Sequence, residues 1–351
     1  MSRIAAVAPV LPAFVYTQAE ITAELAPLIS SVPGKRAVLE RMHASSGIAM
    51  RHTALPLEAY RDLGDFRRAN DTFIEVATDL AERALRTALA DAGLEPPDVD
   101  FVMFTSVTGI SAPSVDALLV SRLGLRPDVK RMPSFGLGCV GGAAGIARVH
   151  DYLVGHPDQV GVLLSVELCS LTLQRDDETM ANFVATGLFG DGAAAVVMVG
   201  ENRAEPGPRI VDTRSSFFPD TREVIGWNIG STGFEIVLTA GVAEVIERHF
   251  PGEVAAFLAD NGKSIADVTT WLAHPGGPRV LDAFAHSLDV DSSEFARSWA
   301  SLDRVGNLSS AAVLHVLADA INEGQEAGAT GLLFALGPGV SAEFVLVEWP
   351  K

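Results

Sequence analysis

The feature that most constrains this chain is an order of helices and strands that occurs twice along it. In each half a helical pattern leads to a short apolar strand, then to a glycine-containing turn that opens a helix of small residues, and then to further strands. Phe101 precedes Cys139 by 38 residues, and Trp271 precedes Asn307 by 36. Alternating helices and strands are typical of sheets covered by helices on both faces. The repeat therefore predicts an α/β fold built as a duplicated layered sandwich.

The two halves meet at residues 200–209, where glycines and prolines signal a break. We expect one half at 1–205, carrying Cys139, and a second at 206–351. The expected helices and strands follow the repeat. Helical patterns cover residues 78–92, 114–123, 253–260, 279–288 and 308–321, and apolar strands cover residues 101–104, 160–166, 193–199, 269–273, 331–335 and 344–347.

Charge and composition limit what the chain can bind. A formal net charge of −18 without any Lys/Arg run disfavours nucleic acid and anionic membranes, and 48% hydrophobic residues exclude a disordered chain. No window approaches about 18 uninterrupted apolar residues, so we expect no membrane-spanning helix. Two cysteines without ligand spacing predict neither a disulfide framework nor a metal site. A cytoplasmic, reducing location is expected.

Cys139 is the first candidate for chemistry. It precedes the helix that begins Gly141-Gly142-Ala143, whose small residues predict close packing against the equally small Ser309-Ser310-Ala311-Ala312 segment. The free amides at a helix N-terminus favour an anion and lower the pKa of a thiol. A lone cysteine in an apolar segment is more often a core residue, and Cys169 is interpreted in that way.

His274 and Asn307 are the second and third candidates. His274 ends an apolar strand and is followed by Pro275-Gly276-Gly277-Pro278, which places its imidazole at the edge of the sheet where ligands bind. There it could pair with a thiolate or donate to an oxyanion. Asn307 could simply cap the following helix. Its position equivalent to Cys139 predicts that both residues face the same space.

A different class of protein competes for the same residues. Gly136 to Gly141 fits the pattern G-x-G-x-x-G, opens a helix, and is followed by Glu167 at the end of the next strand, as in a dinucleotide site. The preceding segment, residues 130–135, is a poor buried strand because it holds two charges and a proline. An NAD(P)-dependent dehydrogenase therefore remains the alternative from another class.

Several motifs in sequence order resemble one known family. They are Gly138-Cys139 with its small helix, residues 188–194 (LFGDGAA), residues 274–278 (HPGGP), residues 306–311 (GNLSSA) and residues 337–339 (GPG). Together they resemble the type III polyketide synthases, the chalcone-synthase-like branch of the thiolase superfamily, over nearly the whole chain. The resemblance implies a thiolase-like duplicated αβαβα sandwich. Single-round ketoacyl synthase III enzymes share the Cys-His-Asn trio, but usually follow the His with Gln-Ala-Asn.

The resemblance implies an acyltransferase that uses acyl-CoA and malonyl-CoA. Cys139, paired with His274, would attack an acyl-CoA thioester, and His274 and Asn307 would stabilise the enolate left when malonyl-CoA loses CO₂. The enolate would attack the Cys139 thioester, the cycle would repeat, and the chain would close to a ring. The family also implies a homodimer and no metal or organic cofactor. Methylmalonyl-CoA remains open as an extender.

The family also suggests residues that bind substrate. Phe189 would be the gate between the CoA tunnel and the cavity, and the second gate position falls at Ile236 or, in another register, at Phe234. Cations at the tunnel mouth match Arg41 and, with more alternatives, Lys35, Arg36 and Arg279. The remaining residues expected to line the substrate site lie in the shared motifs: Gly276, Gly277, Ser309 and Gly337.

The closest resemblance within the family is to bacterial alkylpyrone synthases. It rests on residues 4–7, 135–140 and 166–170, and on Ala112, where plant relatives carry a bulky residue that crosses the dimer. This resemblance implies a medium- or long-chain fatty acyl-CoA starter and alkyl α-pyrone products. Starter length, the number of extensions and the type of ring closure are left open by the sequence.

Overall fold

The computed structural model describes residues 1–350, and its largest element is a nine-stranded sheet in the order β11-β12-β13-β8-β1-β7-β6-β4-β5. Its strands are β1 (Ser2–Val10), β4 (Phe101–Ser106), β5 (Lys130–Phe135), β6 (Val160–Leu168), β7 (Asp191–Gly200), β8 (Arg209–Phe217), β11 (Thr270–Ala273), β12 (Thr330–Gly337) and β13 (Ser341–Glu348). Two small sheets pair β2 (Phe14–Thr17) with β3 (Met50–Thr53), and β9 (Ile225–Gly230) with β10 (Gly233–Leu238).

The helices follow the same repeat. The α-helices are α1 (Gln18–Ile29), α2 (Pro33–Ala44), α3 (Phe66–Ala92), α4 (Val115–Leu123), α5 (Gly141–Val154), α6 (Met180–Leu188), α7 (Gly241–Asp260), α8 (Pro278–Leu288), α9 (Ala296–Val305) and α10 (Ala312–Glu323). The 3₁₀ helices are η1 (Leu57–Asp62), η2 (Pro96–Asp98), η3 (Gly138–Val140), η4 (Cys169–Thr172), η5 (Ile265–Asp267), η6 (Ser292–Phe295) and η7 (Ser309–Ala311).

The strand order shows the duplication directly. From the centre outward, β1-β7-β6-β4 on one side corresponds to β8-β13-β12-β11 on the other, with the same sequence of antiparallel and parallel neighbours. β1 and β8 pair at only two positions, through Ser2 and Arg3, so the two sides of the sheet separate around the central helices. Only β5, at one edge, has no counterpart. The expected duplicated thiolase-like sandwich is confirmed.

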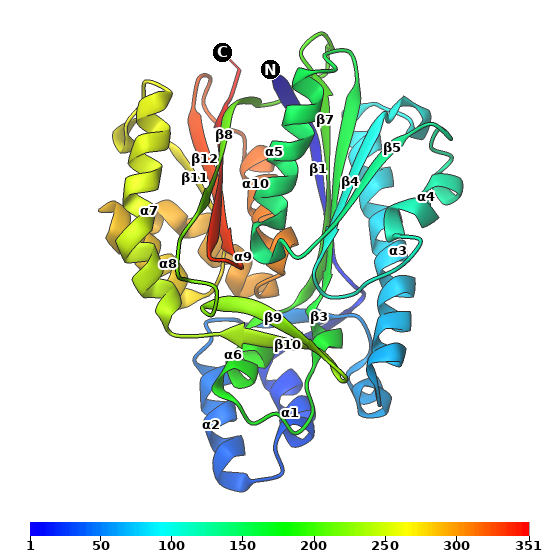
Figure 1. The fold of residues 1–351 in the computed structure, drawn as a ribbon, viewed down its shortest axis with the longest axis vertical. Coiled ribbons are helices and arrows are strands. Elements are labelled where there is room, and N and C mark those ends of the chain that lie inside the picture. Colours follow the sequence, from blue (N-terminus) through cyan, green and yellow to red (C-terminus); the bar gives the residue numbers. More distant parts are fainter. Residues whose placement is uncertain (351) are drawn as a thin grey trace.

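Figure 1 shows the layers: α3 on one outer face, α7 and α8 on the other, and α5 with α10 in the middle between the two halves of the sheet. Three apolar clusters fill the spaces between these layers. The expected close packing of the small helices is present, because a Cβ at Gly142 would lie 2.3 Å from the carbonyl oxygen of Ser310. Any larger residue at this position would push α5 and η7 apart.

All six predicted strands are present, most of them longer than predicted. Two helices begin earlier than predicted: α3 at Phe66 instead of 78, and α7 at Gly241, so that Pro251 lies inside it. The segment judged a poor buried strand is β5, an exposed edge strand. Within the described residues 1–350, no helix has the length and apolarity needed to span a bilayer, as expected. The halves at 1–205 and 206–351 remain a prediction as folding units.

Candidate active site

The catalytic candidates lie where η3 and η7, the turns before the two central helices, face each other. Cys139 is the middle residue of η3 and is half-buried, and its Sγ lies 3.7 Å from the Oγ of Ser309 at the start of η7. A Cβ at Gly337 would lie 2.9 Å from the backbone nitrogen of Val140. The turn that carries the thiol is therefore fixed from both halves of the molecule.

Asn307 lies two residues before η7 and makes two hydrogen bonds with its side chain. Its Oδ1 accepts from the Ser309 backbone nitrogen at 2.8 Å, and its Nδ2 donates to the Gly276 carbonyl oxygen at 3.1 Å. The first bond closes an Asx turn, and the N-cap of η7 is Leu308, so the expected capping by Asn307 is not what the structure shows. The second reaches the loop that follows His274. Asn307 thus fixes its own turn and joins it to the His274 segment.

His274 follows β11, and its backbone nitrogen donates to Phe334 of the neighbouring strand β12. Its side chain is 3% exposed, and its Nδ1 is buried without a hydrogen-bond partner in the described chain. The structure records no hydrogen bond between the imidazole and the Cys139 thiol. The contacts Cys139–Ser309, Ser309–Asn307 and Asn307–Gly276 nevertheless link the three segments, so the expected convergence of the two halves is present.

Burial sets the protonation of the two ionisable candidates. Burial away from water raises the pKa of the Cys139 thiol to about 12. The hydrogen bond to Ser309 lowers this pKa, and the negative charge of Glu167 raises it. Burial alone lowers the pKa of His274 to about 3. The resting pair is therefore a neutral thiol and a neutral imidazole. The expectation that the helix N-terminus lowers the pKa of this thiol is wrong for this site, because desolvation dominates.

Two cavities lie on either side of the segment that ends in Phe189. The outer pocket has a volume of about 640 Å³, and its lining includes Met42, Leu188, Leu238, Gly276, Gly277 and Arg279. The inner cavity has a volume of about 40 Å³, and its lining includes Arg51, Cys169, Phe189, Trp227, Phe234 and Ile236. Phe189 also forms a backbone bridge with Asn307. Phe189 thus lines the inner cavity beside Asn307, and its role as a gate stays a prediction.

The second gate position is shared by two residues. Both Phe234 and Ile236 of β10 line the inner cavity. The ring of Phe234 packs against Phe66, Phe135 and Trp227, so it is held in an aromatic cluster. Ile236 has no such partners and is half-buried. The two registers that the sequence left open thus correspond to two residues of the same wall.

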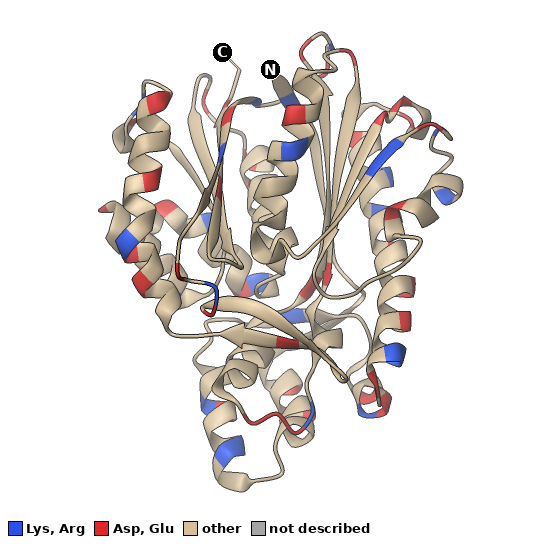
Figure 2. Ribbon diagram, viewed as in Figure 1, with Lys and Arg blue, Asp and Glu red and all other residues tan. Residues whose placement is uncertain are grey.

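The cations expected at the tunnel mouth have different surroundings. Arg279 lines the outer pocket. Arg41 is exposed on α2, the helix that supplies Val38 and Met42 to the pocket wall. Figure 2 shows Lys and Arg positions in blue on this helix. Lys35 is paired with Glu178 instead, outside the pocket lining, so its expected contribution is not supported. Arg36 likewise donates to the carbonyl oxygen of Ser30.

Glu167 argues against a dinucleotide site. Its carboxylate is fully buried and accepts hydrogen bonds from Val107, Thr108 and Ser310. Those groups leave no route by which it could bind a ribose hydroxyl. Two glycines of the G-x-G-x-x-G pattern, Gly138 and Gly141, instead allow η3 and α5 to pack against Pro338 and Ser310 of the second half.

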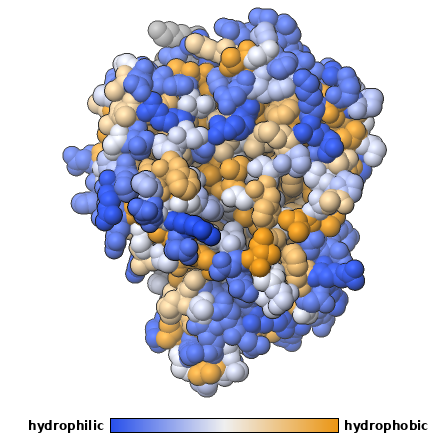
Figure 3. All heavy atoms as spheres, in the orientation of Figure 1, coloured by the Kyte–Doolittle hydropathy of each residue, from blue (hydrophilic) through white to orange (hydrophobic). Residues whose placement is uncertain are grey.

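Sequence reasoning missed several residues of the inner cavity. Cys169, interpreted as a core residue, is 8% exposed and lines this cavity. Arg51 and Trp227 also line it and were not singled out. No local motif surrounds these residues, because the cavity is assembled from α1, β3, η4, α6 and the β9–β10 hairpin. The hairpin crosses the front of the molecule in Figure 1, and apolar surface gathers near it in Figure 3.

Comparison with known proteins matches both halves to one family. Residues 3–202 match the N-terminal domain of chalcone and stilbene synthases, and residues 209–349 match the C-terminal domain. A 1,3,6,8-tetrahydroxynaphthalene synthase of Streptomyces peucetius subsp. caesius is 50% identical over 99% of this chain and 93% of its own length. The α-pyrone synthesis polyketide synthase-like Pks18 of Mycobacterium tuberculosis is 32% identical over 90% of this chain and 83% of its own.

A solved structure agrees with these matches. The 1,3,6,8-tetrahydroxynaphthalene synthase of Streptomyces coelicolor A3(2), a bacterial type III polyketide synthase, superposes with a TM-score of 0.94 at 30% identity, covering 99% of both chains. The fold and the matches define an acyl-transferring enzyme of the thiolase-like class. The chain belongs to the chalcone and stilbene synthase family and is a type III polyketide synthase. It condenses malonyl-CoA units iteratively, which excludes the dehydrogenase and the single-round ketoacyl synthase as alternatives.

Proposed function

We propose that this enzyme makes 1,3,6,8-tetrahydroxynaphthalene from malonyl-CoA alone. The observation that carries the proposal is the 50% identity, over 99% of the chain, to a synthase of that product. The inner cavity of about 40 Å³ holds neither a long alkyl tail nor a ten-carbon product as it stands, so the choice between the two starters rests on the sequence identity.

The product has the carbon count that this reaction gives. Five malonyl-CoA molecules supply ten carbons after five losses of CO₂, with oxygens on alternate carbons. One aldol closure, which releases water, and one Claisen closure, which releases the last CoA, join these carbons into two fused rings. Four oxygens then remain at positions 1, 3, 6 and 8. The balance is five malonyl-CoA to one tetrahydroxynaphthalene, five CO₂, five CoA and one water.

In the priming step we assign Cys139 as the nucleophile and His274 as its base. Because the resting thiol is neutral, its proton must pass to the imidazole as sulfur attacks the thioester carbonyl. The carbon–sulfur bond to CoA breaks, and CoA leaves as a thiol with that proton. Ser309, whose Oγ lies 3.7 Å from the sulfur, helps to hold the thiol in place.

In the condensation step Asn307 and His274 act as hydrogen-bond donors. Loss of CO₂ from a second malonyl-CoA leaves an enolate, whose oxygen both side chains stabilise. One N–H of Asn307 Nδ2 is held by Gly276, which leaves the other for the enolate. The enolate attacks the Cys139 thioester, and the longer chain leaves on CoA and returns to the sulfur. These steps use only groups of the chain, so we propose no metal or organic cofactor.

The outer pocket is the proposed CoA site. Its volume of about 640 Å³ lies in the range of pockets that hold cofactor-sized ligands. Its lining includes Gly276 and Gly277 beside the catalytic loop, and Arg279 supplies a cation for phosphate. Arg41 lies close by on α2. We place the enzyme in the cytoplasm, because both of its cysteines are free thiols, as is usual in a reducing compartment.

The test is the product formed by the purified enzyme from malonyl-CoA without any other starter. We expect tetrahydroxynaphthalene, with all ten carbons labelled from uniformly ¹³C-labelled malonyl-CoA, identified by mass spectrometry. A parallel panel offers acetyl-, hexanoyl- and lauroyl-CoA. Absence of a ten-carbon aromatic product from malonyl-CoA alone would contradict the proposal.

Alkyl α-pyrone synthesis from a fatty acyl-CoA is the second candidate. It is supported by the 32% identity to Pks18, an α-pyrone synthesis protein by name, and by the apolar lining of the inner cavity. This activity requires Phe189 or the β9–β10 hairpin to move and make space for the alkyl chain. Pyrones as the main product from lauroyl-CoA and malonyl-CoA would favour this candidate.

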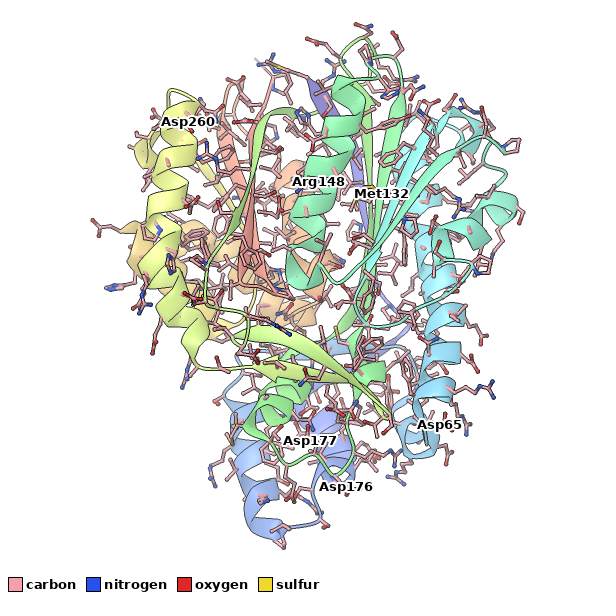
Figure 4. All side chains as sticks on the ribbon, viewed as in Figure 1. Asp65, Met132, Arg148, Asp176, Asp177 and Asp260 are labelled. Atoms are coloured by element: carbon pink, nitrogen blue, oxygen red, sulfur yellow. The ribbon has the colours of Figure 1, made fainter. Side chains whose placement is uncertain are left out.

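We also propose that the enzyme is a homodimer with β5 at its contact. β5 is an exposed edge strand, and Met132 on it (Figure 4), Phe135 at its end and the nearby Ile110 are large apolar residues exposed by 37%, 45% and 47%. Burying them removes apolar surface from water. Light scattering is expected to give twice the chain mass of 37.0 kDa, and Met132→Lys to lower it. A monomeric wild-type enzyme would contradict the proposal.

A further inference from the structure

Arg51 is a buried cation at the wall of the inner cavity that the catalytic steps leave unused. It lies in the short strand β3 and is 4% exposed. Its side chain packs against the backbone beside Asn307, because a Cβ at Gly306 would lie 3.1 Å from Arg51 Cδ. This places the guanidinium directly behind the gate and the Asn307 turn.

Part of the guanidinium has hydrogen-bond partners. Nε donates to Gln18 Oε1 at 2.8 Å, and Nη1 donates to the carbonyl oxygen of Phe189 at 2.7 Å. Gln18 in turn donates to the carbonyl oxygen of Gly187 at 2.8 Å. Nη2 is buried and has no hydrogen-bond partner in the described chain. Nε and Nη1 of the guanidinium are thus held by hydrogen bonds, and Nη2 is the nitrogen without a partner.

The charge of Arg51 also lacks a direct counter-ion. No carboxylate of the described residues lies within 4.0 Å of it. The nearby Asp191 instead accepts hydrogen bonds from Ala54 and Ser170. Burial lowers the pKa of Arg51 to about 10, which still leaves it cationic at neutral pH. A buried charge is costly unless anions or acceptors compensate it, and the charge of Asp191 compensates Arg51 only in part, so the unpaired Nη2 is the group that points to a ligand.

The rest of the cavity wall suits an anion. No Asp or Glu lines it, although the whole chain has a net charge of −18. The side-chain amide nitrogens of Gln174 and Asn182 already donate to backbone carbonyls, as does the hydroxyl of Thr172. The free N–H of Arg51 is therefore the donor that a bound anion would use, and because Nη2 is itself buried, the anion reaches it when the cavity wall opens locally.

We propose that Arg51 binds the distal carboxylate of the starter while the polyketide chain grows on Cys139. The inner cavity does not include Cys139 in its lining, so a chain on Cys139 would reach Arg51 only with its far end, after passing Phe189 and Cys169. A malonyl starter keeps its own carboxylate at that end, whereas a fatty acyl starter ends in a methyl group. This inference rests on the proposed function and names the chemical class of starter, an acyl-CoA with a distal carboxylate.

The test compares two starters that differ only in that charge. Glutaryl-CoA and its methyl ester are each supplied with malonyl-CoA, and kcat/KM for the starter is measured by product mass spectrometry. The wild-type enzyme is expected to prefer glutaryl-CoA by at least about tenfold, the usual scale for a charged hydrogen bond. In Arg51→Gln the preference is expected to disappear, because kcat/KM falls more for glutaryl-CoA than for its methyl ester.

Two controls separate binding from structure. Arg51→Lys keeps the charge and is expected to retain part of the preference, and Arg222→Gln, at a side chain 92% exposed, leaves it unchanged. Equal loss for both starters in Arg51→Gln, or no preference in the wild type, would overturn the proposal. The wild-type comparison stands even if Arg51→Gln does not fold. It is also independent of the malonyl-only product, so either proposal can fail alone.

Discussion

Replacing Cys139 by alanine is expected to lower product formation by more than about 10⁴-fold, because no other group can form the covalent acyl intermediate. Cys139 lies in η3 with its sulfur beside Ser309, and alanine removes the sulfur without adding volume to the tight packing of α5. The fold should therefore persist. The measurement is the intact mass of the protein after incubation with malonyl-CoA, together with the amount of product and the melting temperature.

The matched control is Cys169→Ala, the only other cysteine in the chain. Cys169 is buried, and the pKa of its thiol is raised well above the ordinary value by burial, with the charges of Glu167 and Asp191 adding to the rise. Cys169 lies in η4 and not in the turn beside Ser309 and the Asn307 segment, so Cys169→Ala should still gain the acyl mass on Cys139. An acyl adduct on the Cys139→Ala protein, or product from it, would remove Cys139 from the mechanism.

The parts of the fold that the sequence predicted are those encoded locally. Apolar strands such as residues 160–166 and 331–335 are buried on both faces, and for this reason their sequences are nearly continuous apolar runs. The glycines before α5 and the small residues of η7 predicted a close approach of two backbones, and Gly142 against Ser310 confirms it. The duplication followed from repeated order and spacing. It correctly predicted that Cys139 and the Asn307 turn face each other.

The features that escaped prediction depend on contacts between distant segments. Arg51 lies in a short strand whose polar residues suggest an exposed position. Its burial follows from the folded chain, in which it donates to Gln18 and Phe189. The inner cavity combines five separate elements, none of which carries a motif for it. Lys35 was expected to bind CoA, yet in the structure it forms an ion pair with Glu178. Such pairings follow from tertiary packing, which sequence spacing does not contain.

The ionisation of the nucleophile is another property that needed the structure. A helix N-terminus favours a thiolate, and from the sequence this was the only visible influence on Cys139. The structure adds burial and the neighbouring Glu167, both of which raise the pKa of the thiol. Because burial also keeps His274 neutral, the two groups must exchange a proton during attack. The same dry site strengthens every hydrogen bond made to the enolate.

The role of Asn307 as a hydrogen-bond donor can be separated from the bond that its Oδ1 accepts from the Ser309 backbone nitrogen. Asn307→Ala is expected to lower product formation by about 10²- to 10³-fold, the usual cost of losing one donor to an oxyanion. Priming should persist, because Cys139 and His274 are unchanged. The measurement is release of ¹³CO₂ from labelled malonyl-CoA, set against the acyl mass on Cys139.

Asn307→Asp provides the matched comparison. Its carboxylate can still accept from the Ser309 backbone nitrogen, so the turn before η7 is kept, but the bond to Gly276 is lost because two oxygens then face each other. If donation by Nδ2 is what matters, Asn307→Asp should lose CO₂ release as fully as Asn307→Ala while its melting temperature stays nearer to the wild type. If Asn307→Asp instead keeps CO₂ release within about threefold of the wild type, Asn307 acts only through its turn, and His274 must stabilise the enolate without a donor from Asn307.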